Sequence, residues 1–129
     1  MAKEPKLKVL VCDPLGKSGM EVLKKDKEVQ VDECPGLKPE ELKKIVGQYD
    51  GLIIRSGTQV TADIIAHAKK LRVVGRAGVG VDNVDLEAAT QRGIIVMNTP
   101  GGNTISTAEH TFSMLMALAR NIPQACHSV

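Results

Sequence analysis

Two arginines and a group of glycines are the residues of this chain whose types and spacing suggest chemistry. Arg55 ends an apolar run, and Arg76 lies inside a glycine-rich turn. The glycines of that turn are Gly75, Gly78 and Gly80. Backbone N–H groups in such a turn can bind a carboxylate or phosphate, and a guanidinium suits bidentate binding of oxyanions. We therefore predict an anion site, against the alternative that each arginine is a solvated strand-end charge.

The same turn carries part of the pattern that binds a dinucleotide. Gly78 and Gly80 match two of the three required glycines, but Asn83 stands where the third is needed. The pattern also needs an acid about 20 residues further on, to bind the ribose hydroxyls. No Asp or Glu occurs between Glu87 and Glu109. The turn therefore favours a small anion over NAD.

Other motifs lack a residue that their chemistry needs. The Gly-Lys-Ser at 16–18 resembles the end of a P-loop, but Val11 stands where that loop needs its first glycine. Arg55 and Asn98 occupy the strand ends where a phospho-receiver domain carries an acid and a lysine. The histidines and cysteines show no spacing typical of a catalytic set or a metal site. They are His67, His110, His127, Cys12, Cys34 and Cys126.

The elements that must position the two arginines are strands and helices that alternate five times. Strands are expected at 7–13, 29–33, 51–56, 72–75 and 93–98. Helices are expected near 20–25, after Pro39, after an N-cap at Thr61, from Asp82 or Asn83 to Thr90, and at 104–121. The alternation predicts an α/β fold: a doubly wound, parallel, five-stranded, flavodoxin-like sheet of order 2-1-3-4-5 with a long C-terminal helix. Ligands of such sheets bind beyond the carboxyl ends of the strands, here Asp13, Arg55–Ser56, 76–80 and 98–103.

Composition excludes several classes of protein. The 129 residues predict a single domain, 1–129, and contain no apolar run long enough to cross a membrane. The net charge is +2 and the only aromatic residues are Tyr49 and Phe112, so a nucleic-acid surface is not expected. The N-terminus is polar, which predicts no secretion signal, a cytoplasmic location and reduced thiols.

Three stretches resemble a known family: RSGTQVTAD at 55–63, VVGRAGVGVDNVDLEAA at 73–89 and VMNTPGGN at 96–103. They are similar to the NAD-dependent D-2-hydroxyacid dehydrogenases, in particular the branch that oxidises 3-phosphoglycerate in serine biosynthesis. The likeness runs from about residue 8 to residue 124. It implies that this chain is the substrate-binding domain of an oxidoreductase. It does not separate phosphoglycerate from a related phosphorylated 2-hydroxy acid.

The resemblance also implies roles for particular residues. Arg55, with Ser56, and Arg76 are expected to hold the phosphorylated substrate. Backbone N–H groups at Gly78 and Val79 are expected to receive its carboxylate. Asn103, at the domain hinge, is expected near the substrate.

The family's NAD-binding Rossmann domain and catalytic Arg, Glu and His follow the region that matches this chain. We therefore expect the 129 residues to hold no catalytic residue, to bind no NAD and to be inactive alone. Val79, where some relatives have Thr, is at most a cofactor contact. Two alternatives of other classes stay open: a non-catalytic interaction module, and a flavin-binding domain, which loop 13–18 disfavours because it is poor in Ser and Thr.

The last predicted helix, 104–121, is apolar on more than one side. One stripe consists of Ile105, Ala108, Phe112, Leu115 and Ala119. Met114, Met116 and Leu118 widen the apolar surface beyond the single stripe that a helix on a sheet needs. The helix is therefore either deeply buried or in contact with another body. The resemblance implies the second, as a dimerisation or swapping surface.

Overall fold

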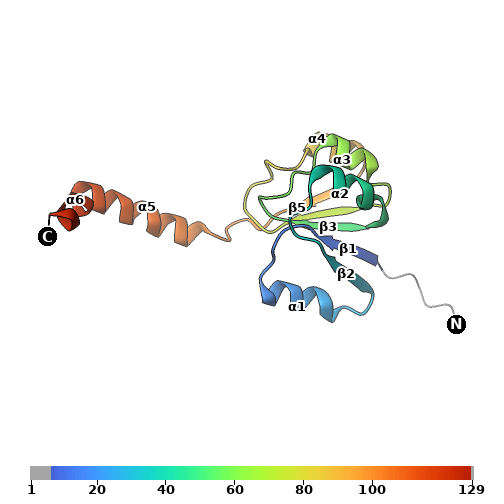
Figure 1. Cartoon of the computed structure of the whole chain (residues 1–129), viewed down its shortest axis with the longest axis horizontal. Coiled ribbons are helices and arrows are strands. Elements are labelled where there is room, and N and C mark those ends of the chain that lie inside the picture. Colours follow the sequence, from blue (N-terminus) through green and yellow to red (C-terminus); the bar gives the residue numbers. More distant parts are fainter. Residues whose placement is uncertain (1–6, 129) are drawn as a thin grey trace.

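A computed structural model describes residues 7–128 and shows a parallel five-stranded sheet with helices around it (Figure 1). The strands are β1 (Leu7–Val11), β2 (Val29–Glu33), β3 (Gly51–Ile54), β4 (Val73–Arg76) and β5 (Ile95–Met97). Their order is β2-β1-β3-β4-β5, and every pairing is parallel. The predicted α/β class, strand order and flavodoxin-like architecture are confirmed. The polar segment 1–6 lies outside the described residues.

The central strand β3 is apolar along its whole length, and the edge strand β2 alternates apolar and polar residues. Strand β3 reads Gly-Leu-Ile-Ile, with three of its four residues buried, because it pairs with β1 and β4 and has side chains covered on both faces. Strand β2 pairs only with β1 and reads Val-Gln-Val-Asp-Glu, so its polar side chains face solvent. Strands β3 and β4 each have a neighbour on both sides, and their carboxyl ends lie next to each other.

Helices α2, α3 and α4 cover one face of the sheet, and α1 lies on the other (Figure 1). Their bounds are α1 (Lys17–Lys25), α2 (Pro39–Ile45) with the 3-10 turn η1 (Val46–Gln48), α3 (Ala62–His67) and α4 (Leu86–Gln91). Pro39 is the first residue of α2, and the Thr61 side chain accepts the Ile64 N–H at the start of α3, as predicted. The core lies between the sheet and α2–α4; its fully buried members include Leu10, Leu42, Leu52, Ile54, Ile64, Ile65 and Val74.

Helix α4 begins later than the sequence predicted. Its N-cap is Asp85, whose side chain accepts the Ala88 N–H at 2.9 Å, and not Asp82 or Asn83. Asn83 is buried and bonds to another loop, while Asp82 faces Arg76. The residues between the glycine turn and α4 therefore connect loops instead of continuing into a helix.

The C-terminal helix is divided in two. Helix α5 (Thr104–Ala119) ends before Asn121, which is left-handed with φ 52°, and α6 (Ile122–His127) follows. Asn tolerates this conformation at a helix end and allows the chain to turn. The single helix predicted to reach residue 121 is thus wrong at its end, though a long helix is present.

Helix α5 extends away from the sheet (Figure 1). None of its residues is buried, so the alternative of a deeply buried helix does not hold for the described chain. Its large exposed apolar residues are Ile105, Phe112, Met114, Leu115, Met116 and Leu118. No helix among residues 7–128 is long and apolar enough to cross a membrane.

The sheet face on the side of α1 is only partly covered. Ile95 and Met97 of β5 remain exposed. An open groove of about 290 Å³ runs over this face along the amino-terminal ends of the strands, from Leu7 to Ile95. It lies at the opposite edge of the sheet from the two arginines.

Candidate functional site

The strand register brings three loops to one edge of the sheet. Ile54 of β3 is level with Arg76 of β4, and Gly75 is level with Met97 of β5. Because these parallel strands end at the same edge, loops 55–58, 77–83 and 98–103 follow side by side. The Ala77 N–H donates to the Ile54 carbonyl at 2.8 Å, which ties the first two loops together. This edge is where the sequence predicted the anion site.

Arg55 leaves β3 toward the loop after β1. Its side chain is exposed, and Nη1 donates to the Pro14 carbonyl at 3.4 Å. That long hydrogen bond leaves most of the guanidinium available to a ligand. Ser56, also exposed, continues the same loop. The sequence prediction that this loop presents a cation at the sheet edge agrees with the geometry.

Unlike Arg55, Arg76 has a mostly buried side chain that packs into its own turn. Its side chain is 11% exposed, and Nη2 lies 3.6 Å from the Asp82 carboxylate. Nη1 donates to the Gly80 carbonyl at 2.6 Å, while Nε is buried without a hydrogen-bond partner. Arg55 and Arg76 therefore have different neighbours, and their convergence on one anion stays a prediction.

The glycines of the turn make room for this arginine. A Cβ at Gly78 would lie 3.0 Å from Arg76 Nη1, and one at Gly80 would lie 3.2 Å from it. The Gly80 position would also bring a Cβ within 2.7 Å of Asp82 Oδ1. The glycine spacing that resembles a nucleotide loop is thus explained by the packing of the guanidinium.

Several amides of the turn are free. The Gly78 N–H donates to the Arg76 carbonyl at 2.9 Å. Within residues 7–128, the N–H groups of 79–81 donate to no carbonyl or side chain. The turn is held from β5 instead, because Asn98 Nδ2 donates to the Val79 carbonyl at 2.6 Å. Free amides beside a guanidinium can bind a carboxylate or phosphate, although Gly78, which the sequence favoured as a donor, is already engaged.

A dinucleotide does not fit this turn. A pyrophosphate needs the N-terminus of a helix directly after the glycines. Here the N-terminus of α4 comes five residues after Gly80 and is occupied by the Asp85 carboxylate. Asn83 is packed where the third glycine would be, and Asn98 follows β5 where an acid would bind ribose.

Asn103 lies at the start of α5, where it is exposed. Its carbonyl accepts the Thr107 N–H at 2.9 Å, and its side chain makes no capping hydrogen bond. No contact joins Asn103 to Arg55 or Arg76 in the described chain. Its role near the substrate stays a prediction.

Two residues that organise the site were missed by the sequence analysis. Asp13 was noted only for its place after β1, and Asn83 was assigned to a helix cap. Both are buried, and both bond to the backbone of Arg55 and Thr58. Asp13 could have been found from its place just after β1, whereas Asn83 lies in a loop between β4 and α4 and left no such signal.

The shallow cavity beside these loops does not suit an anion. It measures about 220 Å³ and is lined by residues 59–61 and 82–85. Asp82 and Asp85 both contribute to its lining, and their charge repels a carboxylate or phosphate. The free amides and Arg55 are therefore the better place for a substrate anion.

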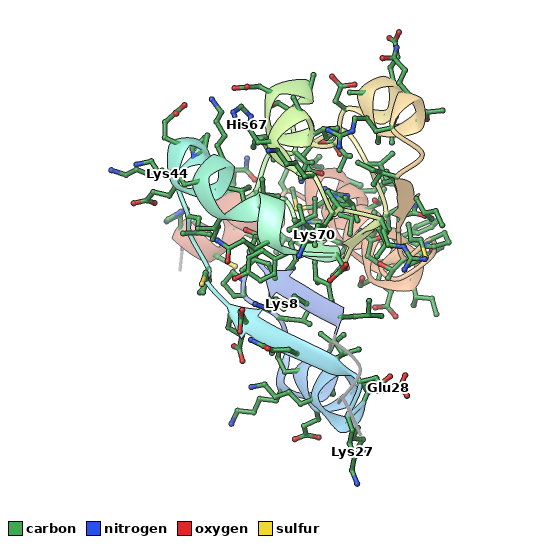
Figure 2. All side chains as sticks on the ribbon, turned by 90° about the vertical axis from the view of Figure 1, so that its right-hand side faces the viewer. Lys8, Lys27, Glu28, Lys44, His67 and Lys70 are labelled. Carbon is green, nitrogen blue, oxygen red and sulfur yellow. The ribbon has the colours of Figure 1, made fainter. Side chains whose placement is uncertain are left out.

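The perturbed ionisable groups lie away from this edge or inside the core. Burial raises the pKa of the Cys12 thiol to about 12, with Asp13 adding to the effect. Burial and the hydrogen bond to Asp32 raise the pKa of Tyr49 to about 12. Figure 2 shows His67 on the outer surface of the molecule, where Nδ1 lies 2.7 Å from the Asp63 carbonyl oxygen. These environments indicate structural roles and no catalytic pairing.

The described residues contain no group of three His, Cys, Asp or Glu side chains placed to hold a metal ion. The cysteines are free: Cys12 is buried, Cys34 half-buried and Cys126 exposed. The site therefore offers amides and guanidinium groups as its ligand-binding chemistry.

Comparison with known proteins assigns this architecture to a family. Residues 9–129 match the family described as D-isomer specific 2-hydroxyacid dehydrogenase, catalytic domain. The chain belongs to this family. The D-2-hydroxyacid dehydrogenase resemblance seen in the sequence is confirmed.

Individual relatives narrow the comparison. The chain is 50% identical over 123 residues to the D-3-phosphoglycerate dehydrogenase of Archaeoglobus fulgidus, covering 95% of this chain and 23% of that protein. It is 56% identical over 122 residues to the enzyme of Sus scrofa, with the same coverages. The chain thus spans about a quarter of the length of the curated relatives it matches.

Solved structures share the fold. The NAD-bound 3-phosphoglycerate dehydrogenase of Entamoeba histolytica matches with a TM-score of 0.76 and 32% identity, over 87% of this chain and 39% of that one. A protein of Thermus thermophilus matches with a TM-score of 0.81 and 38% identity, over 93% of this chain and 39% of that one. The fold and the family therefore agree.

Proposed function

We propose that this chain is the substrate-binding domain of an NAD-dependent D-3-phosphoglycerate dehydrogenase. The observation that carries the proposal is 50–56% identity to such enzymes across 95% of the chain. In the intact enzyme the reaction oxidises 3-phosphoglycerate to 3-phosphohydroxypyruvate, the entry to serine biosynthesis, in the cytoplasm. The activity is proposed for the whole protein, and substrate binding is proposed for these residues.

The geometry supports a division of labour at the sheet edge. The free amides of 79–81 suit the planar carboxylate of the substrate, as a backbone concavity does for other anions. Arg55 is exposed and suits the phosphate, because its guanidinium can donate two parallel hydrogen bonds. Arg76 supplies positive charge from within the turn and keeps the amides in place through Gly80. Together they orient the carbon whose hydrogen is removed.

The oxidation removes a hydride from C2 of the substrate and a proton from its hydroxyl group. NAD, when bound to the intact enzyme, supplies the hydride acceptor. The described residues do not fit a dinucleotide, so we assign neither the hydride acceptor nor the base to this chain. The domain's proposed task is to hold the two anionic ends of the substrate.

Titration of the purified chain followed by NMR tests this proposal. We expect 3-phosphoglycerate to shift the amide signals of 79–81 and the side-chain signal of Arg55, and NADH to shift none. Replacing Arg55 with Met should weaken 3-phosphoglycerate binding about tenfold, the effect of one lost charge-assisted hydrogen bond. Arg72→Met is the matched control, because Arg72 is exposed at the opposite edge of the sheet. Equal affinities for the two variants contradict the assignment.

A second candidate function is self-association through α5. This helix has no buried residue, and its large apolar side chains are exposed: Phe112 by 68% and Leu118 by 67%. Contiguous exposed apolar surface of this kind is typical of a protein–protein contact. Self-association is compatible with substrate binding, because α5 begins only after loop 98–103. Without substrate binding, the chain would be a non-catalytic interaction module.

A further inference from the structure

We propose that Asp13 and Asn83 are positioning residues that hold loop 55–58 at its two ends and so set where Arg55 meets the substrate anion. The inference rests on the proposed function, because it assigns these two residues to the same site. Neither residue contacts the substrate in this proposal. Both act through the backbone of the loop.

Asp13 holds the N–H groups of the loop. Its side chain lies at the end of β1, the residue is 7% exposed, and Oδ2 accepts the Arg55 N–H at 2.6 Å and the Thr58 N–H at 3.1 Å. Oδ1 lies only 2.6 Å from where a Cβ of Gly57 would be. The carboxylate therefore fits a loop of this sequence, with a glycine at its third position.

Asn83 holds the carbonyl groups of the same two residues. It is 4% exposed, and Nδ2 donates to the carbonyls of Arg55 and Thr58, at 2.6 Å each. An amide nitrogen carries two hydrogens, so one Asn can serve both carbonyls. Buried backbone groups need such partners. Two side chains thus satisfy the N–H and C=O groups at both ends of a loop that no strand pairs.

The pair also links the two arginine loops. Asn83 belongs to the segment that follows the glycine turn, two residues after the free amides end and one after Asp82, which faces Arg76. Its own carbonyl accepts the Val60 N–H at 2.8 Å, so the segment is fixed at its backbone as well. The spacing between Arg55 and the turn amides is therefore set by buried hydrogen bonds and not by the exposed side chains.

Four variants test the assignment in the purified chain. Asp13→Ala removes the acceptor, and Asn83→Asp replaces the donor with an acceptor that repels two carbonyls. Asp13→Asn keeps an oxygen in place for both N–H groups and removes only the charge. Asp26→Ala is the matched control, because Asp26 also accepts one backbone N–H, that of Glu28, in a distant turn.

The readouts are 3-phosphoglycerate affinity and hydrogen exchange at the amides of Arg55 and Thr58. We expect Asp13→Ala and Asn83→Asp to weaken binding at least tenfold and to speed exchange at both amides. Asp13→Asn should bind within about threefold of the parent chain, and Asp26→Ala should bind as the parent does. If Asp13→Asn loses as much affinity as Asp13→Ala, charge and not position is the cause, and the proposal is overturned.

The same data separate this proposal from the proposed function. If the parent chain binds no 3-phosphoglycerate, substrate binding by these residues is contradicted. Exchange at Arg55 and Thr58 then decides the positioning role, which fails if Asp13→Ala leaves both rates unchanged. Should Asn83→Asp prevent folding, the comparison of Asp13→Ala with Asp13→Asn carries the test.

Discussion

Arg76 donates a 2.6 Å hydrogen bond from Nη1 to the carbonyl of Gly80, four residues along the same turn. The guanidinium thus packs against the backbone of its own turn, and the N–H groups of 79–81 have no partner on the described chain. In sequence this turn resembles a nucleotide-binding loop, but in the structure it surrounds the side chain of Arg76. Its glycines are explained by this contact.

Replacing Gly80 with Ala tests that explanation. The new Cβ would lie 2.7 Å from Asp82 Oδ1 and 3.2 Å from Arg76 Nη1. The Asp82 side chain is 83% exposed and free to move, so we expect the free energy of unfolding to change by less than about 1 kcal/mol. Arg76 should be displaced. A changed Nε–Hε signal of Arg76 in the NMR spectrum, with an unchanged melting curve, is the expected result; an unmoved signal contradicts it.

Gly57 should respond differently to the same substitution. A Cβ there would lie 2.6 Å from Oδ1 of Asp13, which is buried and held by two backbone N–H groups. Because this carboxylate cannot swing into solvent, Gly57→Ala should lower the free energy of unfolding by about 1–3 kcal/mol. Urea unfolding measures it.

Gly16→Ala is the control for both glycine variants. Its Cβ would meet nothing within 4 Å, and its φ of −63° suits any residue. We expect Gly16→Ala to change the free energy of unfolding by less than about 1 kcal/mol, because the restriction of the unfolded chain favours Ala while the N-cap position of α1 favours Gly. A Gly57→Ala chain as stable as Gly16→Ala would show that Asp13 is not fixed.

The fold was predictable because each strand is a short apolar run and each crossover carries its own helix. The parallel sheet followed from that alternation and from the handedness of crossovers, and the strand order followed from the order usual in flavodoxin-like domains. Thr61 and Pro39 marked helix starts by local chemistry, which acts within a few residues and can therefore be read from sequence.

The details of the site were harder to predict, because they depend on contacts between distant residues. Asn83 is a residue type common at helix N-caps. Its side-chain amide instead donates to the Arg55 carbonyl, 28 positions earlier, and Asp85 caps α4. Arg76 was expected to bind an anion together with Arg55, but its guanidinium packs into its own turn, where the neighbouring glycines leave room for it. Neither contact produces a periodic pattern in the sequence.

Stability should fall at alkaline pH because of Cys12. Burial raises the pKa of this thiol from 9.0 to about 12. Above pH 9 the unfolded chain releases the proton while the folded chain keeps it, so the free energy of unfolding decreases as pH rises toward 12. The contribution is complete below pH 9. Urea unfolding between pH 8 and 11 measures the slope.

Cys12→Ala should reduce that slope, although the variant is less stable at every pH because it leaves a cavity. Tyr49 should also lower the free energy of unfolding as the pH rises above 10, because its pKa is raised to about 12. Tyr49→Phe measures the contribution of Tyr49 to this pH dependence. A slope unaffected by Cys12→Ala contradicts the assignment. Thiol labelling at pH 8 gives an independent reading: exposed Cys126 should react and Cys12 should not.

The apolar surface of α5 predicts concentration-dependent self-association. Phe112 lies in the middle of the helix, 68% exposed, with Leu115 58% exposed one turn further on. Burying such side chains against a second copy is worth about 1.5–3 kcal/mol each. We expect sedimentation velocity to show a fraction of dimer that increases with concentration. Phe112→Glu should shift the chain toward monomer, because it places a charge in the contact.

Ser113→Glu provides the matched control, because it adds the same charge to the next exposed position of the same helix. If the apolar stripe forms the contact, Ser113→Glu should leave the dimer largely intact while Phe112→Glu dissociates it. Equal effects of the two variants would show that charge alone governs the association. A parent chain that sediments as a monomer at every concentration contradicts the prediction, and leaves α5 to pack against a surface that a second copy does not supply.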